Sequence, residues 1–119
     1  MTDIYKLHDA AFAQVSAFVI LDKAGDRVAT IAFKFPRDGA GRLYAYVHWL
    51  GTEMVRGYAN GYGYDKKTAA IESAIGHFTL PDGYTGTGFI PFVEVLKNVG
   101  GSTWDYRLRE EGFTVLQAV

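Results

Sequence analysis

The sequence predicts one α+β domain, residues 1–119, built as an antiparallel meander of three to five strands with two or three helices packed on one face. The first half alternates apolar and polar residues with a period of two, as half-buried strands do. Short turns containing Gly, Asp and Pro separate these segments, and turns of this length join antiparallel neighbours. The second half instead carries helix-capping residues and apolar residues at helical spacing.

Three strands are expected before residue 51. The first, 14–22, is rich in Val, Ile and Phe and ends at a turn, 23–26. The second is 27–35, and its two faces consist of Ala29, Ile31, Phe33 and Phe35 and of Val28, Thr30, Ala32 and Lys34. After a turn at 36–41 comes the third, 42–50, whose faces consist of Leu43, Ala45, Val47 and Trp49 and of Tyr44, Tyr46, His48 and Leu50.

The middle of the chain predicts a change from strand to helix. A fourth strand, weakened by glycines, is expected at 54–62, and Asp65 is placed to cap a helix over 66–75. The glycine-rich segment 76–88 is predicted to be a loop. A short helix is then expected at 90–99. Its proline falls in the first turn, where proline is tolerated.

The end of the chain admits two interpretations. Ser102 or Thr103 can cap a helix over 104–111, and Gly112 stands where a left-handed residue ends a helix. The competing interpretation makes 104–109 a strand, followed by a hairpin turn at 110–112. We favour the helix, because its two ends bracket a normal helix length. Residues 113–119 are then predicted to be a last strand that completes the sheet.

The composition excludes several kinds of chemistry. The chain has no cysteine, which excludes disulfides, thiol catalysis and thiolate metal sites together. Its 12 basic and 13 acidic residues give a net charge of −1, without the positive excess usual in nucleic-acid-binding domains. The longest strongly apolar run, 15–21, is too short to cross a bilayer, and no signal peptide is recognisable. We therefore expect no membrane partner.

The segment 57–68 is the most unusual part of the sequence, GYANGYGYDKKT. It could bind an anion, because N–H groups at a helix N-terminus favour anions and Lys66 or Lys67 could add positive charge. Neither the P-loop nor the dinucleotide fingerprint is present, however, and the Asp65 carboxylate would itself occupy the free N–H groups. We favour the structural interpretation, a tight strand-to-helix turn that packs tyrosines.

Tyrosines recur in this segment and in the third strand. Such rings form hot spots in protein interfaces and can stack on single-stranded bases. Arg42 and Arg56 are the only arginines close to them in sequence, so a protein interface is favoured over nucleic acid. Ordinary burial of amphipathic rings is the simplest alternative. The candidate partner-binding residues are Tyr44, Tyr46, Tyr58, Tyr62, Tyr64 and Lys66.

No catalytic or metal-binding constellation is recognisable in the sequence. The three histidines, His8, His48 and His77, lie far apart, and no pair has metal-ligand spacing. No nucleophile-elbow motif accompanies a serine, and the carboxylates show no paired pattern for acid–base chemistry. We therefore expect no metal, no cofactor and no enzymatic activity, and a small enzyme centred on a histidine is the least favoured function.

Three segments of the second half, 61–70, 100–104 and 108–119, carry a resemblance to a known group. They contain a Gly-Tyr-Asp-Lys-x-Ser/Thr-Ala-Ala element, a tryptophan-bearing helix and a closing Gly-aromatic-x-Val strand, here with Gly112 and Phe113. In these features the chain resembles a group of small bacteriophage and prophage proteins. The first half matches that group only in general character, and no catalytic residue is carried over from it.

The resemblance implies a setting for the function. Small phage proteins without a catalytic motif often bind and block a host machine, including CRISPR–Cas and other defence complexes. The leading hypothesis is therefore a non-enzymatic anti-defence protein that binds a host protein complex in the bacterial cytoplasm. The alternative is a nucleotide- or single-stranded nucleic-acid-binding protein that uses the Gly/Tyr-rich turn. An open sheet edge would also permit a homodimer.

Overall fold

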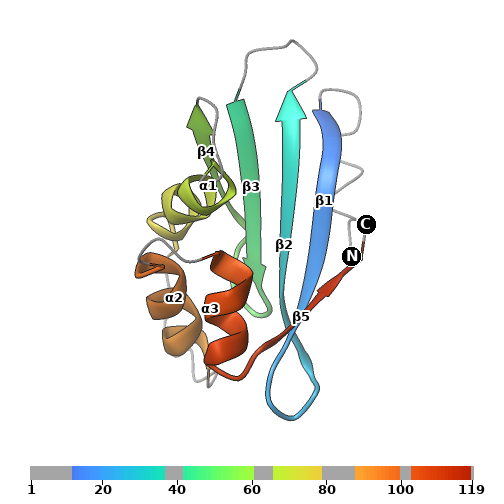
Figure 1. The fold of residues 1–119 in the computed structure, drawn as a ribbon, viewed down its shortest axis with the longest axis vertical. Helices are drawn as coiled ribbons and strands as arrows, with labels where there is room; N and C mark the ends of the chain where they lie inside the picture. The colour runs from blue at the N-terminus through green and yellow to red at the C-terminus, as the bar shows by residue number, and fades with distance from the viewer. Residues whose placement is uncertain (1–11, 37–41, 61–65, 79–87, 100–102, 119) are drawn as a thin grey trace.

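The computed structural model describes residues 12–36, 42–60, 66–78, 88–99 and 103–118 of the 119-residue chain (Figure 1). Its elements within these ranges are β1 (Phe12–Leu21), β2 (Arg27–Pro36), β3 (Arg42–Trp49), β4 (Val55–Asn60), α1 (Lys66–Ile75), α2 (Phe89–Lys97), α3 (Trp104–Glu110) and β5 (Thr114–Gln117). Strands fill the first half and helices most of the second, as the alternation of apolar residues predicts.

The strands form one antiparallel sheet in the order β4-β3-β2-β1-β5. The first four are neighbours in the order of the chain, so they form the expected meander, and β5 returns to pair with the second half of β1. Figure 1 shows α1, α2 and α3 together on one side of the sheet, gathered toward β3 and β4. The predicted α+β class and the closing role of the C-terminal strand are confirmed.

The main core lies between the sheet and the helices. The strands contribute the faces predicted to be apolar, and Ile31, Phe33 and Val47 have no exposed surface. Trp49 is at the centre of an aromatic cluster, with ring centroids 5.6 Å from Phe89, 5.0 Å from Phe92 and 6.4 Å from Phe113. Rings at these separations add attraction beyond the area they bury. The cluster joins α2 and the start of β5 to the sheet.

Most predicted boundaries are correct to within two residues. The helix over Lys66–Ile75 begins and ends as expected. The helix α3 is confirmed and the competing strand is wrong, because Trp104 and Leu108, one helical turn apart, are both buried against the core. The fourth strand begins at Val55, one residue later than predicted, and is described to Asn60; residues 61 and 62 of the prediction lie outside the described residues. The predictions for Asp65 and Ser102 and for most of the turn at 36–41 and the loop at 76–88 lie outside the described residues.

The end of α3 has the geometry that the glycine predicts. Gly112 has a φ of +104°, and its N–H donates to the Arg109 carbonyl at 3.0 Å. The next N–H, from Phe113, donates to the Leu108 carbonyl at 3.0 Å. These two bonds form a Schellman motif, and the accompanying contact is between Phe113 and Leu108, both in the core. The motif turns the chain from α3 directly into β5.

The start of α3 differs from the prediction in one respect. Thr103 takes the N-cap position with an extended backbone, but its hydroxyl makes no capping bond to the helix backbone. The hydroxyl instead bonds to the Asp105 carboxylate. Burial alone would raise the pKa of Asp105, but hydrogen bonds from Thr103, Arg109 and the Tyr106 backbone, with the Arg109 charge, lower it below the ordinary value. Asp105 therefore stays ionised in the first turn of α3, where a negative charge is favourable.

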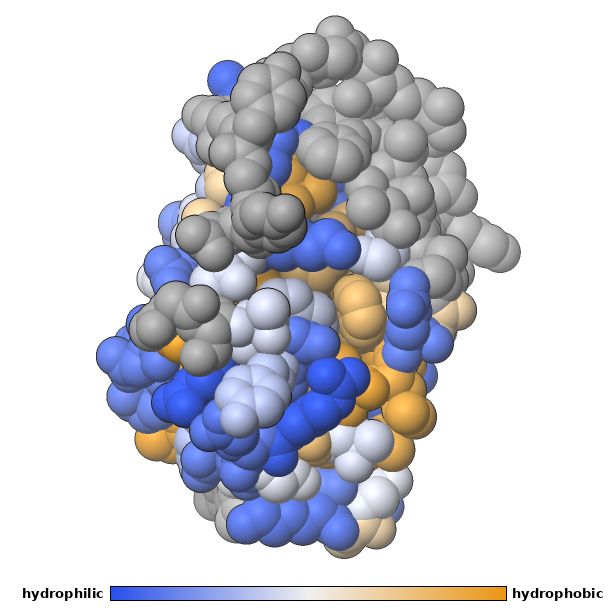
Figure 2. All heavy atoms as spheres, in the orientation of Figure 1, coloured by the Kyte–Doolittle hydropathy of each residue, from blue (hydrophilic) through white to orange (hydrophobic). Residues whose placement is uncertain are grey.

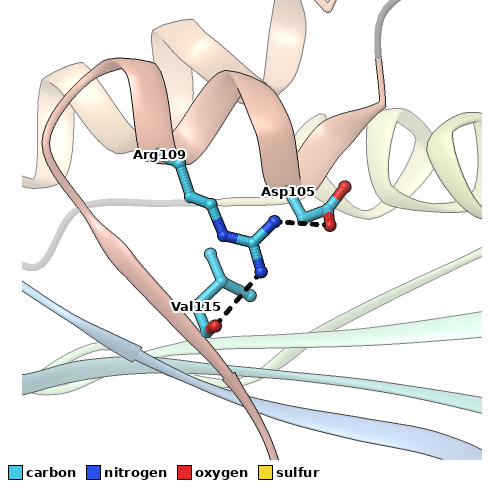
Figure 3. Close-up of polar contacts among 3 residues, drawn as sticks. All are labelled: Asp105, Arg109 and Val115. Atoms are coloured by element: carbon cyan, nitrogen blue, oxygen red, sulfur yellow. Dashed lines mark hydrogen bonds and ion pairs between the residues drawn. The ribbon is translucent and has the colours of Figure 1, made fainter.

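Arg109 connects α3 to β5 (Figure 3). One end of its guanidinium donates to Asp105 Oδ2 at 2.8 Å, and the other donates to the Val115 carbonyl at 3.3 Å. A guanidinium suits this task because its donors are fixed in a plane and can serve two acceptors at once. The bond to Val115 satisfies a carbonyl on the side of β5 that has no neighbouring strand among the described residues.

Candidate partner-binding surface

The tyrosines of β3 and β4 lie on the face of the sheet opposite the helices, which we call the distal face. Residues in register across strands share a face. One row consists of Lys34, Tyr44 and Tyr58, and the next consists of Ala17, Ala32, Tyr46 and Arg56. The predicted separation of faces is confirmed for the third strand and for residues 29–34 of the second. It is wrong for Val28, because a bulge where Ile20 pairs with Ala29 and Leu21 with Arg27 lets Val28 pack against the main core. Three of the six candidate partner-binding residues come together on the distal face.

Four of these residues, with Arg42 from the same face of β3, form what we call the Tyr/Arg patch: Arg42, Tyr44, Tyr46, Arg56 and Tyr58. The rings of Tyr44 and Tyr58 are 5.8 Å apart between centroids and tilted by 44°. The guanidinium carbon of Arg42 lies 5.4 Å from the centroid of Tyr58, and that of Arg56 lies 5.2 Å from the centroid of Tyr44. Both distances are within the range of cation–π attraction.

The register explains this crossed arrangement. Tyr44 is directly opposite Tyr58, and Tyr46 is directly opposite Arg56. Each arginine reaches the tyrosine that lies diagonally from it on the other strand, a distance that long side chains can span. Each strand therefore supplies one arginine to a tyrosine of the other strand. Arg42, Arg56 and Tyr58 are exposed, so both contacts lie at the surface.

Tyr46 supports the patch from beneath. It is 2% exposed and packs with Ala17 and Ala32 in a second, smaller cluster on the distal face, with Tyr44 and Met54 against it. Burial raises the pKa of the Tyr46 hydroxyl, and this outweighs the opposite effect of the nearby Arg56 charge. The Tyr46 phenol therefore stays neutral. Tyr46 supports the patch from the buried side and is not an exposed contact.

Gly57 lets α1 hold β4 from the other side of the sheet. A Cβ at this position would collide with the backbone of Ala74 and lie 2.7 Å from the Ala70 carbonyl oxygen. The N–H of Tyr58 donates to Ser73 Oγ at 3.3 Å, so α1 also satisfies a donor of this edge strand. The glycine that weakens the strand in a propensity argument is therefore required by close packing. This contact fixes the backbone between Arg56 and Tyr58.

Charge is segregated between the two faces. None of the strands in the described ranges contains Asp or Glu, whereas β2, β3 and β4 contribute Lys34, Arg42 and Arg56 to the distal face. The carboxylates lie on helices and turns, and Figure 2 shows hydrophilic side chains gathered over α2 and α3 on the helix-bearing side. Among the described residues, the strands therefore give the distal face positive charges and no carboxylate, although the whole chain has a net charge of −1.

Of the other three candidate residues, only Lys66 is described, and it lies away from the patch. Lys66 is the first residue of α1, which packs on the helix-bearing side of the sheet. Beside it, Lys67 lies with its Nζ 5.3 Å from the centroid of Phe33 in the main core. Tyr62, Tyr64 and the centre of the Gly/Tyr-rich segment lie outside the described residues.

The histidines show a structural role where they are described. His48 Nε2 bonds to the Thr52 carbonyl oxygen at 3.1 Å, within the turn between β3 and β4. His77 is exposed just after α1, and His8 lies outside the described residues. Across the part of the chain that the structure describes, no three His, Asp or Glu residues gather as a metal site would require. None of its helices has the length and hydropathy needed to cross a membrane.

Comparisons with protein-family models, curated proteins and solved structures give no match for this chain. Its function must therefore be argued from its own residues.

The two arginines are the part of the patch that the sequence interpretation did not assign. They lie 14 positions apart and next to different tyrosines, so sequence distance alone gives no reason to group them. A signal was nevertheless present, because Arg42 has the same parity as Tyr44 and Tyr46, and Arg56 the same as Tyr58. Strand parity therefore places both arginines on the tyrosine face once the β3–β4 pairing is known.

Proposed function

We propose that this protein is a non-enzymatic phage-type accessory protein that binds a host protein complex and inhibits it. The Tyr/Arg patch is the observation that carries the proposal. Tyrosine and arginine are among the residues that dominate the energetics of protein interfaces. The resemblance of the second half to small phage proteins suggests the class of target, a CRISPR–Cas or other defence complex in the bacterial cytoplasm.

The geometry of the patch supports recognition of a protein surface. The cation–π contacts hold Arg42 and Arg56 in place before binding, so less side-chain entropy is lost when a partner is bound. Tyr46 and the Gly57–α1 contact fix the two strands from below. The result is a small, rigid surface with exposed rings and charges, which is the character of a hot-spot cluster.

Retention of a partner from bacterial lysate tests the proposal. We expect the tagged full chain to retain a stoichiometric protein complex, and Tyr58→Ala to reduce this retention by about tenfold or more, as loss of a hot-spot residue does. The matched control is Tyr106→Ala on α3, because the two tyrosines are similarly exposed, 48% for Tyr58 and 54% for Tyr106. Both variants should unfold within about 0.5 kcal/mol of the wild type, as surface substitutions usually do.

Inhibition is tested by phage plating on a CRISPR-protected strain. Expression of the wild type should restore plaques, Tyr58→Ala should not, and Tyr106→Ala should behave as the wild type. Failure to retain any stoichiometric complex from several hosts would contradict the proposal. Equal retention by Tyr58→Ala and Tyr106→Ala would mean that the patch is not the surface that binds the partner.

Single-stranded nucleic acid is a second candidate ligand. The observation that favours it is the pairing of Arg42 with Tyr58 and of Arg56 with Tyr44, because aromatic rings beside arginines can stack on bases and neutralise phosphates. Titration with labelled single- and double-stranded DNA and with common nucleotides at low salt separates the candidates. Binding that weakens steeply with added salt would favour nucleic acid over a protein complex.

A further inference from the structure

Arg56 differs from the arginines of α3 because no carboxylate among the described residues is paired with it. Arg107 and Arg109 are paired with Glu110 and Asp105 at 3.0 and 2.8 Å. Arg56 is exposed and lies over the Tyr44 ring, and the described residues offer it no carboxylate. A ring attracts a guanidinium without using its N–H donors, which lie in the guanidinium plane. Arg56 also donates to the Tyr46 hydroxyl, so it is held in position while its remaining donors can bind an anion.

The surroundings of Arg56 favour an anion over any other partner group. Arg42 and Lys34 add positive charge on the same face, and no Asp or Glu occurs in the strands that form it. An anion in the patch would meet no repulsion from the strands, and the positive charges would also steer its approach. The Tyr44 ring lies against Arg56 and contacts the Tyr58 ring, so apolar ring surface borders the site.

We propose that the Tyr/Arg patch binds an acidic protein segment, with a carboxylate of the partner paired to Arg56 beside the Tyr44 ring. This inference rests on the proposed function and specifies the chemistry of the partner. A carboxylate accepts two parallel N–H bonds from one guanidinium, a geometry that lysine cannot reproduce. The small number of exposed cations here, two arginines on adjacent strands, suits a few carboxylates better than the continuous phosphates of a nucleic acid, whose binding proteins usually carry a larger basic excess.

Binding of a defined acidic peptide to the purified full chain tests the inference. The probe is a labelled octaglutamate, with octaglutamine as the neutral control, measured by fluorescence anisotropy at low salt. We expect octaglutamate to bind more tightly than octaglutamine and to weaken as salt is added. Arg56→Glu should lower the affinity for octaglutamate by at least about tenfold, as loss of a charge pair at an interface does. Arg56→Lys should fall between the two, because the charge remains and the bidentate geometry is lost.

The control variant is Lys97→Glu, an exposed lysine in the last turn of α2, whose apolar residues pack in the main core on the helix-bearing side of the sheet. It also replaces a positive by a negative charge and should leave octaglutamate binding unchanged. Circular dichroism of each variant establishes that it is folded. Equal binding of the two peptides, or equal losses in Arg56→Glu and Lys97→Glu, would overturn the inference.

A third probe, an oligonucleotide of eight thymidines, separates carboxylate from phosphate. Tighter binding of this probe than of octaglutamate, with dependence on Arg56, would overturn the acidic protein segment in favour of nucleic acid. Because these titrations need only the purified chain, their failure leaves the lysate experiment to decide the proposed function independently.

Discussion

Two pairs of arginines in this molecule meet different partners. On α3, Arg107 and Arg109 bond to carboxylates of the same helix, and Arg109 also bonds to β5. On β3 and β4, Arg42 and Arg56 lie over tyrosine rings. In the first region both positive charges are neutralised within the helix, and Arg109 also holds two elements together. In the second, Arg56 is positioned by a ring and meets no carboxylate among the described residues, so its charge can act on something outside the chain.

The two regions also differ in how their backbones are fixed. The α3–β5 connection depends on a positive-φ glycine and two capping hydrogen bonds at Gly112 and Phe113. The patch depends on an absent side chain, because Gly57 allows α1 to pack directly on β4. A substitution at Gly112 should therefore reduce only the stability of the fold. A substitution at Gly57 should reduce the stability of the fold and also change the geometry of the patch.

Gly57→Ala should have the largest effect. The added Cβ would collide with the backbone of α1 near Ala74, which cannot move as a flexible side chain would. We expect a loss of about 1–3 kcal/mol in the free energy of unfolding, the usual cost of overpacking, and weaker partner binding because Arg56 and Tyr58 shift with the strand. Urea denaturation and the lysate experiment measure the two effects.

The matched control for Gly57 is Gly76→Ala, at the end of the same helix. A Cβ at Gly76 would make only an ordinary contact, 3.6 Å from the Ser73 carbonyl oxygen. Its free energy of unfolding should stay within about 0.5 kcal/mol of the wild type. If Gly57→Ala proved as stable as Gly76→Ala, the close approach of α1 to β4 would be wrong.

Gly112→Ala should have a smaller effect that is confined to folding. Its φ of +104° is unfavourable for a residue with a Cβ, and the new methyl group would overlap the end of the Lys23 side chain, which can move aside. We expect a loss of about 1–2 kcal/mol, with partner binding per folded molecule unchanged. Gly25→Ala isolates the backbone cost, because Gly25 has a φ of +88° and no atom within 4 Å of its added Cβ. A smaller loss at Gly112 than at Gly25 would contradict the steric argument.

The fold was predictable because its signals are local. The alternation in 27–35 and 42–50 follows from each residue's own polarity, and the structure confirms the faces from Ala29 onward. The exception, Val28, lies at a bulge, which depends on the pairing with β1. The stop signal at Gly112 is equally local, since a helix end needs a left-handed residue. Thr103 occupies the predicted N-cap position, but its hydroxyl bonds to the Asp105 side chain instead of the helix backbone. A propensity argument does not include that competition.

The candidate surface was only partly predictable because it depends on pairing between strands. The tyrosines were conspicuous by composition, but their relation to Arg42 and Arg56 is set by the β3–β4 register, Tyr44 opposite Tyr58. The short β3–β4 connection indicates that the strands pair, yet a shift of two residues would preserve every face and separate these partners. Gly57 was likewise interpreted only as a residue that weakens the strand. The reason for a glycine there is the close packing of α1, which the sequence of the strand does not show.

Asp105→Asn should have the smallest effect on the free energy of unfolding. It removes the charge that is paired with Arg109 on α3. The folded chain lowers the pKa of Asp105, so the ionised carboxylate stabilises the native state. That contribution is fully present above the pKa of an unfolded aspartate, about 3.9, and is lost as the pH falls through the lower folded value. Because the pair with Arg109 is partly exposed, we expect a loss of under about 1 kcal/mol at pH 7.

The sign of the pH dependence distinguishes this pair from a general effect of charge. The difference in the free energy of unfolding between the wild type and Asp105→Asn should shrink as the pH is lowered below 4. Asp26→Asn, which makes the same charge change in the β1–β2 turn, serves as the control and should show a smaller difference at pH 7. Urea denaturation between pH 3 and 7 measures both. A difference for Asp105→Asn that grew in acid would mean that Arg109 is not neutralised by Asp105, and the contrast between the two groups of arginines would be lost.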